Sequence, residues 1–235
     1  MDSQSIIIVP TYNEAENIEK LAGSIRSYLP SVTILVIDDN SPDGTAAIVK
    51  SLIKNDPKVD IIERPGKMGL GSAYIAGFKY ALEREFEYIF EMDADFSHNP
   101  AHLPKFLEAI KEADLVIGSR YVPGGGVRNW SVLRKLISLG GSIYSRLILS
   151  LPYKDLTGGF KCFRRRTLQA IDLDRIYSEG YSFQIEMTYH AHNLGFRVRE
   201  VPIIFEDRTG GKSKMSNKIF FEAIYRVWQI RLTSR

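Results

Sequence analysis

The sequence predicts an α/β fold in which a doubly wound, mostly parallel sheet is flanked by helices. Short apolar runs alternate with longer segments whose apolar residues recur at helical spacing, and this rhythm is typical of parallel strands joined by helices. Two of the apolar runs end in aspartates, at the strand ends where open α/β sheets bind their ligands. The 235 residues are enough for a large core in one such domain.

The first strand is predicted over residues 6–9 (IIIV), and Pro10 closes it. In the helix that follows, apolar residues at positions 18, 21, 22, 25 and 29 share one face. Asn13, with Glu16 three residues later, resembles a capping box at the start of this helix.

Two further strands are predicted over residues 33–37 (TILVI) and 59–63. A turn at residues 40–45 begins the helix between them. A glycine-rich loop, residues 66–71, then leads into a helix that runs to about Leu82. Because this loop fits neither the dinucleotide-binding fingerprint nor a Walker loop, we expect it to be a tight turn.

The fourth strand ends in the most informative segment of the chain, YIFEMDADFSH at residues 88–98. An apolar run of aromatic and β-branched residues, typical of a buried parallel strand, stops at Asp93-Ala94-Asp95. Two carboxylates at this spacing can share one hard cation, and Mg²⁺ usually takes one or two carboxylates together with phosphate oxygens. The pattern therefore indicates a metal clamp for a phosphorylated ligand, although solvated loop acids give the same pattern.

Asp38 and Asp39 end the second strand, so a parallel sheet would direct them to the same crevice as Asp93 and Asp95. Four acids at one edge need a cation or hydrogen-bond donors to neutralise them. Donors from a nucleoside would suit the first pair, and a metal would suit the second. The alternative for Asp39, and for Asp43, is that it caps the next helix.

The remaining predicted elements follow in chain order, and the sequence pattern changes after Arg120. A helix is predicted over residues 103–113 and a fifth strand over 115–118. Beyond them we expect helices over residues 133–151, 183–194 and 217–232, a strand entered through residues 155–163, a strand over 198–205, and a basic mobile loop at 210–214. The helices over residues 133–151 and 217–232 could present an apolar face at the surface of the molecule. The alternative is that both pack in the core in the ordinary way.

The net charge of +3 is divided unevenly between the two halves of the chain. Residues 1–118 hold 11 basic and 19 acidic side chains, whereas residues 119–235 hold 20 basic and 9 acidic ones. The basic half points to an anionic partner, which could be nucleic acid, anionic lipid or a phosphorylated substrate. Aromatic residues do not interleave with the basic ones as they do on nucleic-acid surfaces, so we expect no nucleic-acid partner.

Several site classes are disfavoured. Cys162 is the one cysteine, which excludes an internal disulfide, favours a reducing compartment and suits core packing. The four histidines are not grouped as in a zinc site, and no Ser/His/Asp or Cys/His arrangement is evident. The N-terminus does not resemble a signal peptide, and no apolar run reaches the roughly 18 residues of a membrane span.

Cations that could hold phosphate groups are scattered through the second half. Their candidate roles are to hold a leaving diphosphate or to hold a phosphate-bearing acceptor against it. They are Arg120, Arg128, Arg134, Lys161, Arg208, Lys212 and Lys214. Arg208 and Lys214 flank a glycine pair whose mobility suits a lid.

Taken together, these motifs resemble glycosyltransferase family 2, which has the GT-A fold, and within it the catalytic subunits of dolichol-phosphate (polyprenol-phosphate) mannosyltransferases. The shared segments cover nearly the whole chain in order. They are VPTYNEAEN at 9–17, IDDNSPDGT at 37–45, GLGSAY at 69–74, MDADFSHNP at 92–100, GSRY at 118–121, DLTGGF at 155–160 and RTGGKSK at 208–214. The resemblance implies one GT-A domain over residues 1–235, with a nucleotide-binding half (1–118) and an acceptor and membrane-facing half (119–235).

The resemblance also implies a role for particular residues. Pro10, Tyr12, Glu14, Ile37 and Asp39 would line a guanosine pocket, and Asp93, Ala94 and Asp95 would lie at the diphosphate. Asp93 and Asp95 would hold Mg²⁺ or Mn²⁺. Ser97 stands where some relatives carry a glutamine ligand, and its shorter hydroxyl leaves the third ligand open. Arg120, Arg134 and Ser138 would grip the acceptor phosphate and act with Asp95 in catalysis, while Arg208 and Lys214 would close over the diphosphate.

The implied reaction transfers mannose from GDP-mannose to dolichyl or polyprenyl phosphate, with inversion at the anomeric centre. The implied location is the cytoplasmic face of a membrane, in the endoplasmic reticulum of a eukaryote or the plasma membrane of a prokaryote. The protein would lie on that surface through amphipathic helices or be held there by small membrane subunits. The alternatives are a related enzyme that uses UDP-glucose or another sugar nucleotide, and a non-catalytic nucleotide-binding module.

Overall fold

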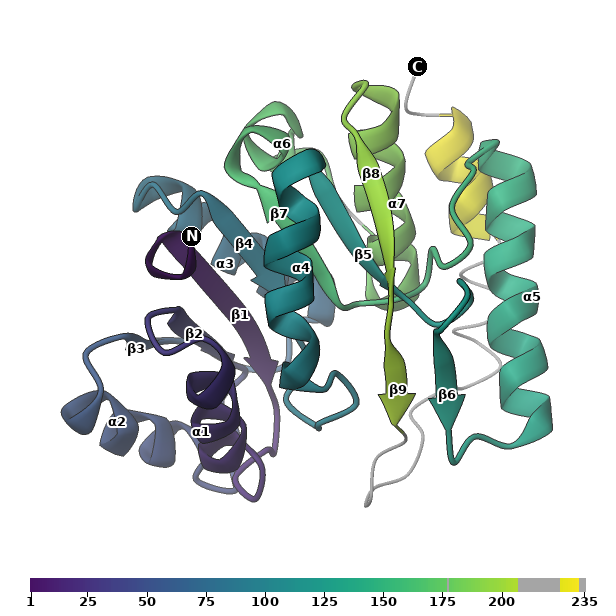
Figure 1. Cartoon of the computed structure of the whole chain (residues 1–235). Coiled ribbons are helices and arrows are strands. Elements are labelled where there is room, and N and C mark those ends of the chain that lie inside the picture. The colour runs from purple at the N-terminus through teal and green to yellow at the C-terminus, as the bar shows by residue number, and fades with distance from the viewer. Residues whose placement is uncertain (177, 207–224, 233–235) are drawn as a thin grey trace.

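The computed structural model describes residues 1–176, 178–206 and 225–232. Its main feature is a seven-stranded sheet with the order β3-β2-β1-β4-β7-β5-β8 (Figure 1). The strands are β1 (Ser5–Thr11), β2 (Thr33–Asp38), β3 (Val59–Glu63), β4 (Tyr88–Glu91), β5 (Leu115–Ser119), β7 (Lys161–Arg164) and β8 (Val198–Pro202). The predicted doubly wound, mostly parallel sheet is confirmed.

The direction of chain travel reverses between β1 and β4. From β1 the chain moves outward through β2 to β3 and then returns to place β4 on the other side of β1. Ligands of open α/β sheets bind at such a switch point, beyond the carboxyl ends of the strands. β7 runs antiparallel between β4 and β5, and so joins the two halves of the sheet.

Helices cover both faces of the sheet and enclose two apolar cores. On one face lie α1 (Ile18–Tyr28), α2 (Thr45–Asn55) and α4 (Leu103–Ala109), and on the other lie α3 (Leu70–Glu83), α6 (Arg165–Ala170) and α7 (Gly180–Asn193). Cys162 is fully buried in the first core, which confirms its packing role. The α6 helix was not predicted from the sequence.

Two local predictions near the start and end of the chain are wrong. Asn13 has a left-handed backbone (φ 62°), and α1 begins only at Ile18, where Asn17 is the cap residue without a side-chain hydrogen bond. Asn13 and Glu16 therefore form no capping box. The segment 198–205 is not one strand, because it leaves the main sheet after β8 and continues as β9 (Ile204–Glu206), which pairs with β6 (Gly126–Arg128).

The long helix α5 (Val132–Leu149) stands at the edge of the molecule (Figure 1). Its inner side contributes Leu149 to a small third core with α7 and with the helical residues 225–232. Val227 and Ile230 are buried there, so the final helix has a packing role over its described part. Over the described residues, we find no helix that is both long and apolar enough to cross a membrane.

At Gly77, α3 packs directly against Ile8 of β1, and a substitution there can test this packing. A Cβ at Gly77 would lie 2.5 Å from Cγ2 of the buried Ile8. We expect Gly77→Ala to destabilise the fold by roughly 1–3 kcal/mol, because overpacking a filled core forces neighbours out of place. Urea unfolding of the purified variant would measure the change.

Gly23→Ala is the matched control, because Gly23 lies on an exposed helix position with no atom within 4 Å of the added Cβ. It should be neutral or stabilising by about 0.5–1 kcal/mol. Equal stability of the two variants would show that α3 does not pack tightly on β1.

Candidate functional site

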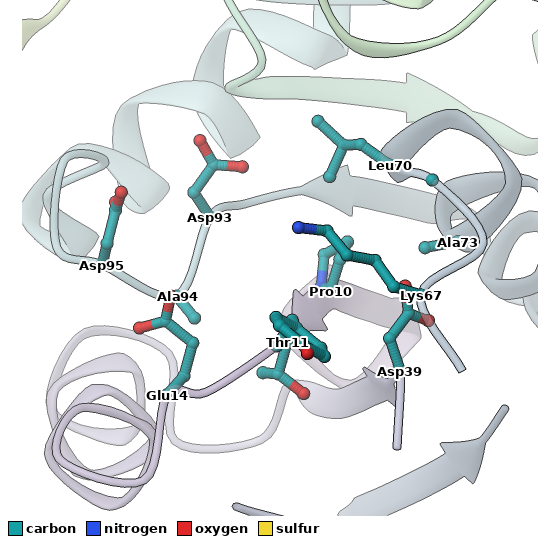
Figure 2. Close-up of a pocket in the computed structure, with 12 residues that line it drawn as sticks. Pro10, Thr11, Glu14, Asp39, Lys67, Leu70, Ala73, Asp93, Ala94 and Asp95 are labelled. Carbon is teal, nitrogen blue, oxygen red and sulfur yellow. The ribbon is translucent and has the colours of Figure 1, made fainter. Parts of the chain in front are cut away.

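A cavity opens at the switch point, beyond the carboxyl ends of β1 and β4 (Figure 2). The cavity has a volume of about 240 Å³, somewhat below the roughly 300–1,000 Å³ of most ligand sites. The residues lining it come from the ends of β1, β2 and β4 and from the start of α3. They are Pro10, Thr11, Tyr12, Glu14, Asp39, Lys67, Gly69, Leu70, Ala73, Asp93, Ala94 and Asp95.

The cavity brings together residues that sequence analysis assigned to the nucleotide and diphosphate. These are Pro10, Tyr12, Glu14, Asp39, Asp93, Ala94 and Asp95. Ile37 differs from the expectation, because it is fully buried in the core shared with α3 and is not part of the cavity wall. Successive side chains along β2 point to opposite faces of the sheet, and Ile37 is on the face that packs in that core.

Asp39 is held in the wall by Arg64 rather than used as a helix cap. Arg64 Nε lies 2.5 Å from Asp39 Oδ1, and the Met68 N–H donates to Oδ2 at 3.3 Å. Arg64 also donates to Ser72 Oγ and to the Gly69 carbonyl. This one arginine therefore fixes both the carboxylate and the glycine-containing loop that forms the opposite rim.

The capping alternative is wrong for Asp39, and it holds for Asp43 in a modified form, from the position before the cap residue. The cap residue of α2 is Gly44, which makes no side-chain cap hydrogen bond. Asp43 instead accepts hydrogen bonds from the N–H and hydroxyl of Thr45, inside the first turn, and from the Ala15 N–H. Asp38 is fully buried and accepts from the hydroxyls of Thr11 and Ser41, so it serves the fold rather than the cavity.

Asp93 and Asp95 extend to the same side of the loop after β4, with Ala94 between them (Figure 2). The Tyr74 hydroxyl donates to Asp93 Oδ1 at 3.3 Å. The Asp93 N–H donates to Nδ1 of His98 at 3.0 Å. Burial lowers the pKa of His98, which agrees with a neutral ring that accepts at Nδ1.

The residues at this loop fit a hard divalent cation. Two carboxylates face one open space, and the buried Ser97 hydroxyl nearby has no hydrogen-bond partner among the described residues. No cluster of three or more His, Cys, Asp or Glu side chains suited to a metal occurs in the described part of the chain. A cation here would therefore depend on two carboxylates and on oxygens of its ligand, which is the usual Mg²⁺ arrangement.

Lys161, one of the candidate phosphate-binding cations, has a different place. It is fully buried and lies beside Glu91 in the β4–β7 register, and its Nζ donates to the Gln184 carbonyl at 2.6 Å. Burial raises the pKa of Glu91 to about 7 and lowers that of Lys161 to about 8. The sequence indicated a strand entered through residues 155–163, but it did not show that this strand lies in the interior of the sheet, where Lys161 is buried.

Arg120 is also buried, and it is paired with Asp155. Its Nε lies 2.7 Å from Asp155 Oδ2 and its Nη2 lies 2.6 Å from Oδ1, while Nη2 also donates to Thr157 Oγ1. The paired nitrogen atoms that could grip a phosphate are already used by this carboxylate. In this arrangement Arg120 supports the site and does not present a bidentate fork to an acceptor.

Arg134 and Ser138 lie on the first turns of α5, near Arg120. The guanidinium carbon of Arg134 is 4.3 Å from the ring centre of Trp130, and the Tyr121 hydroxyl donates to Ser138 Oγ at 2.7 Å. Arg128 is exposed and pairs with Glu206. Arg208, Lys212 and Lys214 lie outside the residues that the structure describes.

Comparison with known proteins gives consistent results. A family model described as glycosyl transferase family 2 matches residues 6–172. An undecaprenyl-phosphate mannosyltransferase of Micrococcus luteus is 49% identical over 230 residues, which cover 98% of this chain and 95% of the relative. A polyprenol monophosphomannose synthase of Mycolicibacterium smegmatis is 47% identical over 232 residues, which cover 97% and 88%.

Solved structures share the fold at low sequence identity. Glucosyl-3-phosphoglycerate synthase from Mycobacterium tuberculosis, in complex with Mn²⁺, UDP and phosphoglyceric acid, superposes with a TM-score of 0.70 at 14% identity. The match covers 97% of this chain and 78% of that one. The predicted GT-A fold is confirmed.

The buried Arg64–Asp39 pair generates a prediction. Both side chains are no more than 10% exposed, so Arg64→Met would leave a buried carboxylate without its counter-ion. We expect a loss of roughly 3–5 kcal/mol in the free energy of unfolding. Urea unfolding of the purified variant would measure it.

Lys50→Met is the control, because Lys50 pairs with Glu63 on the surface, where both side chains are about half exposed. Loss of that pair should change stability by about 0–1 kcal/mol. If both methionine variants were equally stable, Arg64 would not be the residue that fixes Asp39.

Proposed function

The chain belongs to glycosyl transferase family 2, and we propose that it transfers mannose from GDP-mannose to dolichyl or polyprenyl phosphate. The observation that carries this proposal is the near full-length identity of 49% and 47% to relatives named as mannosyltransferases of undecaprenyl phosphate and polyprenol phosphate. The cavity at the switch point supports it, because its wall suits a nucleoside diphosphate sugar.

The donor would lie along the cavity. Asp39 and Tyr12, with Pro10 and Glu14, stand at the end that would take guanosine, because a carboxylate there can accept base N–H groups or ribose hydroxyls. Asp93, Ala94 and Asp95 stand at the end that would take the diphosphate. Arg208 and Lys214 are proposed to close over it on the strength of the sequence motif alone.

Asp93 and Asp95 would hold Mg²⁺ or Mn²⁺ at the diphosphate, with Ser97 as a candidate further oxygen. When bound, the ion would neutralise charge on the leaving diphosphate and orient it. Tyr74 and His98 would keep the Asp93 carboxylate and its backbone in place through the contacts described above. Such supporting residues tune how well a carboxylate holds its cation.

The acceptor chemistry suits a site without a general base. A phosphate monoester is mostly dianionic at pH 7, because its second pKa is near ~6. One of its oxygens can attack the anomeric carbon directly as the bond from that carbon to GDP breaks, which inverts the centre and leaves GDP and the lipid phosphate mannose. No proton has to be removed, so the buried, neutral His98 is not required as a base.

The acceptor would approach from the α5 side. Arg134 and Ser138 on α5 would contact its phosphate, and the Arg120–Asp155 pair beneath would hold this side of the site in place. Catalysis would then consist of positioning the phosphate oxygen against the sugar and of stabilising the charge that develops on the diphosphate.

We further propose that α5 lies on the membrane that carries the lipid acceptor. Six large apolar residues of one α5 face are 38–75% exposed, namely Val132, Leu133, Leu136, Leu139, Ile143 and Leu147. Residues 129–154 contain four basic side chains and no acidic one. An apolar face bordered by cations is the pattern of a helix that rests on an anionic bilayer, and the proposed location is peripheral, on the cytoplasmic face.

The donor and the metal are tested in one experiment. Labelled GDP-mannose, UDP-glucose and UDP-N-acetylglucosamine are offered in parallel with a short polyprenyl phosphate, Mg²⁺ or Mn²⁺, and an EDTA control. We expect product from GDP-mannose alone, abolished by EDTA. Asp95→Asn should lower transfer at least ~100-fold, because charge on the diphosphate is then no longer neutralised, and should weaken Mn²⁺ binding measured by electron paramagnetic resonance.

Asp174→Asn, at a carboxylate that is 79% exposed and is not part of the cavity wall, is the control and should leave transfer unchanged. Product from a UDP-sugar would agree with the proposed mechanism but would contradict GDP-mannose as the donor. Transfer that persists in EDTA and in Asp95→Asn would overturn the metal clamp. Absence of product from every donor, with folded protein and a solubilised acceptor, would favour a binding module.

The membrane surface is tested with the double variant Leu133→Ser, Leu136→Ser. These side chains are 68% and 62% exposed, so the free energy of unfolding should change little. Sedimentation with vesicles containing anionic phospholipid should show at least ~10-fold weaker binding, because two leucines no longer enter the bilayer. Leu194→Ser, half exposed at the end of α7, is the control, and equal vesicle binding by both variants would contradict the assignment to α5.

A further inference from the structure

Trp130, immediately before the cap residue of α5, carries a buried donor that the fold does not use. The residue is 9% exposed, and its Nε1 is shielded from solvent without a hydrogen-bond partner among the described residues. A buried tryptophan N–H normally finds a partner, because leaving it unpaired costs the desolvation of the group. An unpaired donor in a native structure therefore calls for an explanation, which can be a ligand, a bound water or ion, or strain.

The surroundings of Trp130 favour an anion. The guanidinium carbon of Arg134 lies 4.3 Å from the indole ring centre, and that of Arg120 lies 5.5 Å from it. Ser131 caps the 18-residue helix α5, and its Oγ accepts from the Arg134 N–H. The positive end of the helix dipole therefore points at this place together with Arg134, while the charge of Arg120 is balanced by Asp155.

Trp130 is also close to the centre of the proposed reaction. Its ring contacts Phe205 edge-on, with 5.3 Å between ring centres, and Phe205 contacts His98 at 5.7 Å in the same manner. His98 in turn accepts the hydrogen bond from the Asp93 N–H. Two ring contacts thus separate the unpaired indole N–H from the residue that supports the candidate metal site.

We propose that the indole N–H of Trp130 donates a hydrogen bond to the phosphate group of the lipid acceptor, and that Trp130 is an acceptor-binding residue together with Arg134. This inference rests on the proposed function, because it takes the acceptor to be a phosphate monoester carried by a lipid. It accounts for the unpaired donor of a tryptophan that lies beside Arg134, and it gives the site a neutral donor that can bind the phosphate without adding charge.

Access to the N–H requires a rearrangement around the indole ring, because Nε1 is shielded from solvent. Arg134 is partly exposed, lies over the ring and is carried by the first turn of α5, so in this proposal its side chain shifts as the phosphate enters.

Fluorescence provides a direct test, because the chain has only two tryptophans. In a Trp228→Phe background, Trp130 is the sole tryptophan, and it is titrated with farnesyl phosphate, with farnesol and with inorganic phosphate. We expect a saturable change in emission with farnesyl phosphate, a much smaller response to farnesol, and weak binding of inorganic phosphate at the same place. An equal response to farnesol and to farnesyl phosphate would overturn the inference.

Kinetics of Trp130→Phe provide the second test. Phenylalanine keeps an aromatic ring beside Arg134, but it is smaller than the indole and has no N–H donor. We expect the KM for the polyprenyl phosphate to rise at least ~10-fold, since a hydrogen bond to a charged group is lost, while the KM for the sugar nucleotide stays unchanged. A purely structural role would lower the melting temperature and leave the acceptor KM as it was, which would sink the proposal.

The proposed function and the proposed role of Trp130 can be contradicted separately. If the parent protein makes no product with a polyprenyl phosphate, the proposed function fails. If the parent makes product and Trp130→Phe matches it at every acceptor concentration, the function stands and the role of Trp130 falls. The fluorescence titration requires no turnover and so reports on phosphate binding in either case.

Discussion

The buried ion pair between Arg120 and Asp155 is the constraint on which the second half of the structure depends. The two side chains are 4% and 0% exposed, so both charges have lost their hydration, and such a pair is tolerated only when nearly every donor and acceptor is satisfied. Asp155 accepts from the Arg120 backbone N–H as well as from two guanidinium nitrogens, and Thr157 takes a further bond. This geometry ties the segment before β7 to the end of β5.

That tie has consequences for both halves of the sheet. It fixes the point from which the chain enters β7, the antiparallel strand that joins β4 to β5. Thr157, held by Arg120, also approaches Ser142 of α5. The same ion pair therefore sets the position of β4, whose end carries Asp93, relative to α5, which carries Arg134.

The features that could be predicted from the sequence are those that depend on residues close together in the chain. The periodicity of apolar residues identified nearly every strand and most helices, and the aspartates at strand ends indicated the cavity, because parallel strands must end at one edge. Partners distant in sequence remained hidden: Arg64 lies 25 residues from Asp39, and Asp155 lies 35 from Arg120. Arg64 directly follows the third predicted strand, and this position at the same edge was the one available signal for it. The burial of Lys161 and the break between β8 and β9 depend on how strands pair, which local patterns do not encode.

The distribution of charge then explains why the two sides of the site differ. The first half of the chain holds eight more acidic than basic residues, and the cavity wall carries Glu14, Asp39, Asp93 and Asp95 against Lys67. A nucleoside diphosphate is itself an anion, so this wall would repel it unless a divalent cation entered with it. The side that we propose for the acceptor has the opposite character, with Arg134, the N-terminus of α5 and the unpaired indole N–H of Trp130. Under this proposal a cation would serve the donor diphosphate, whereas the chain's own donors would hold the acceptor phosphate.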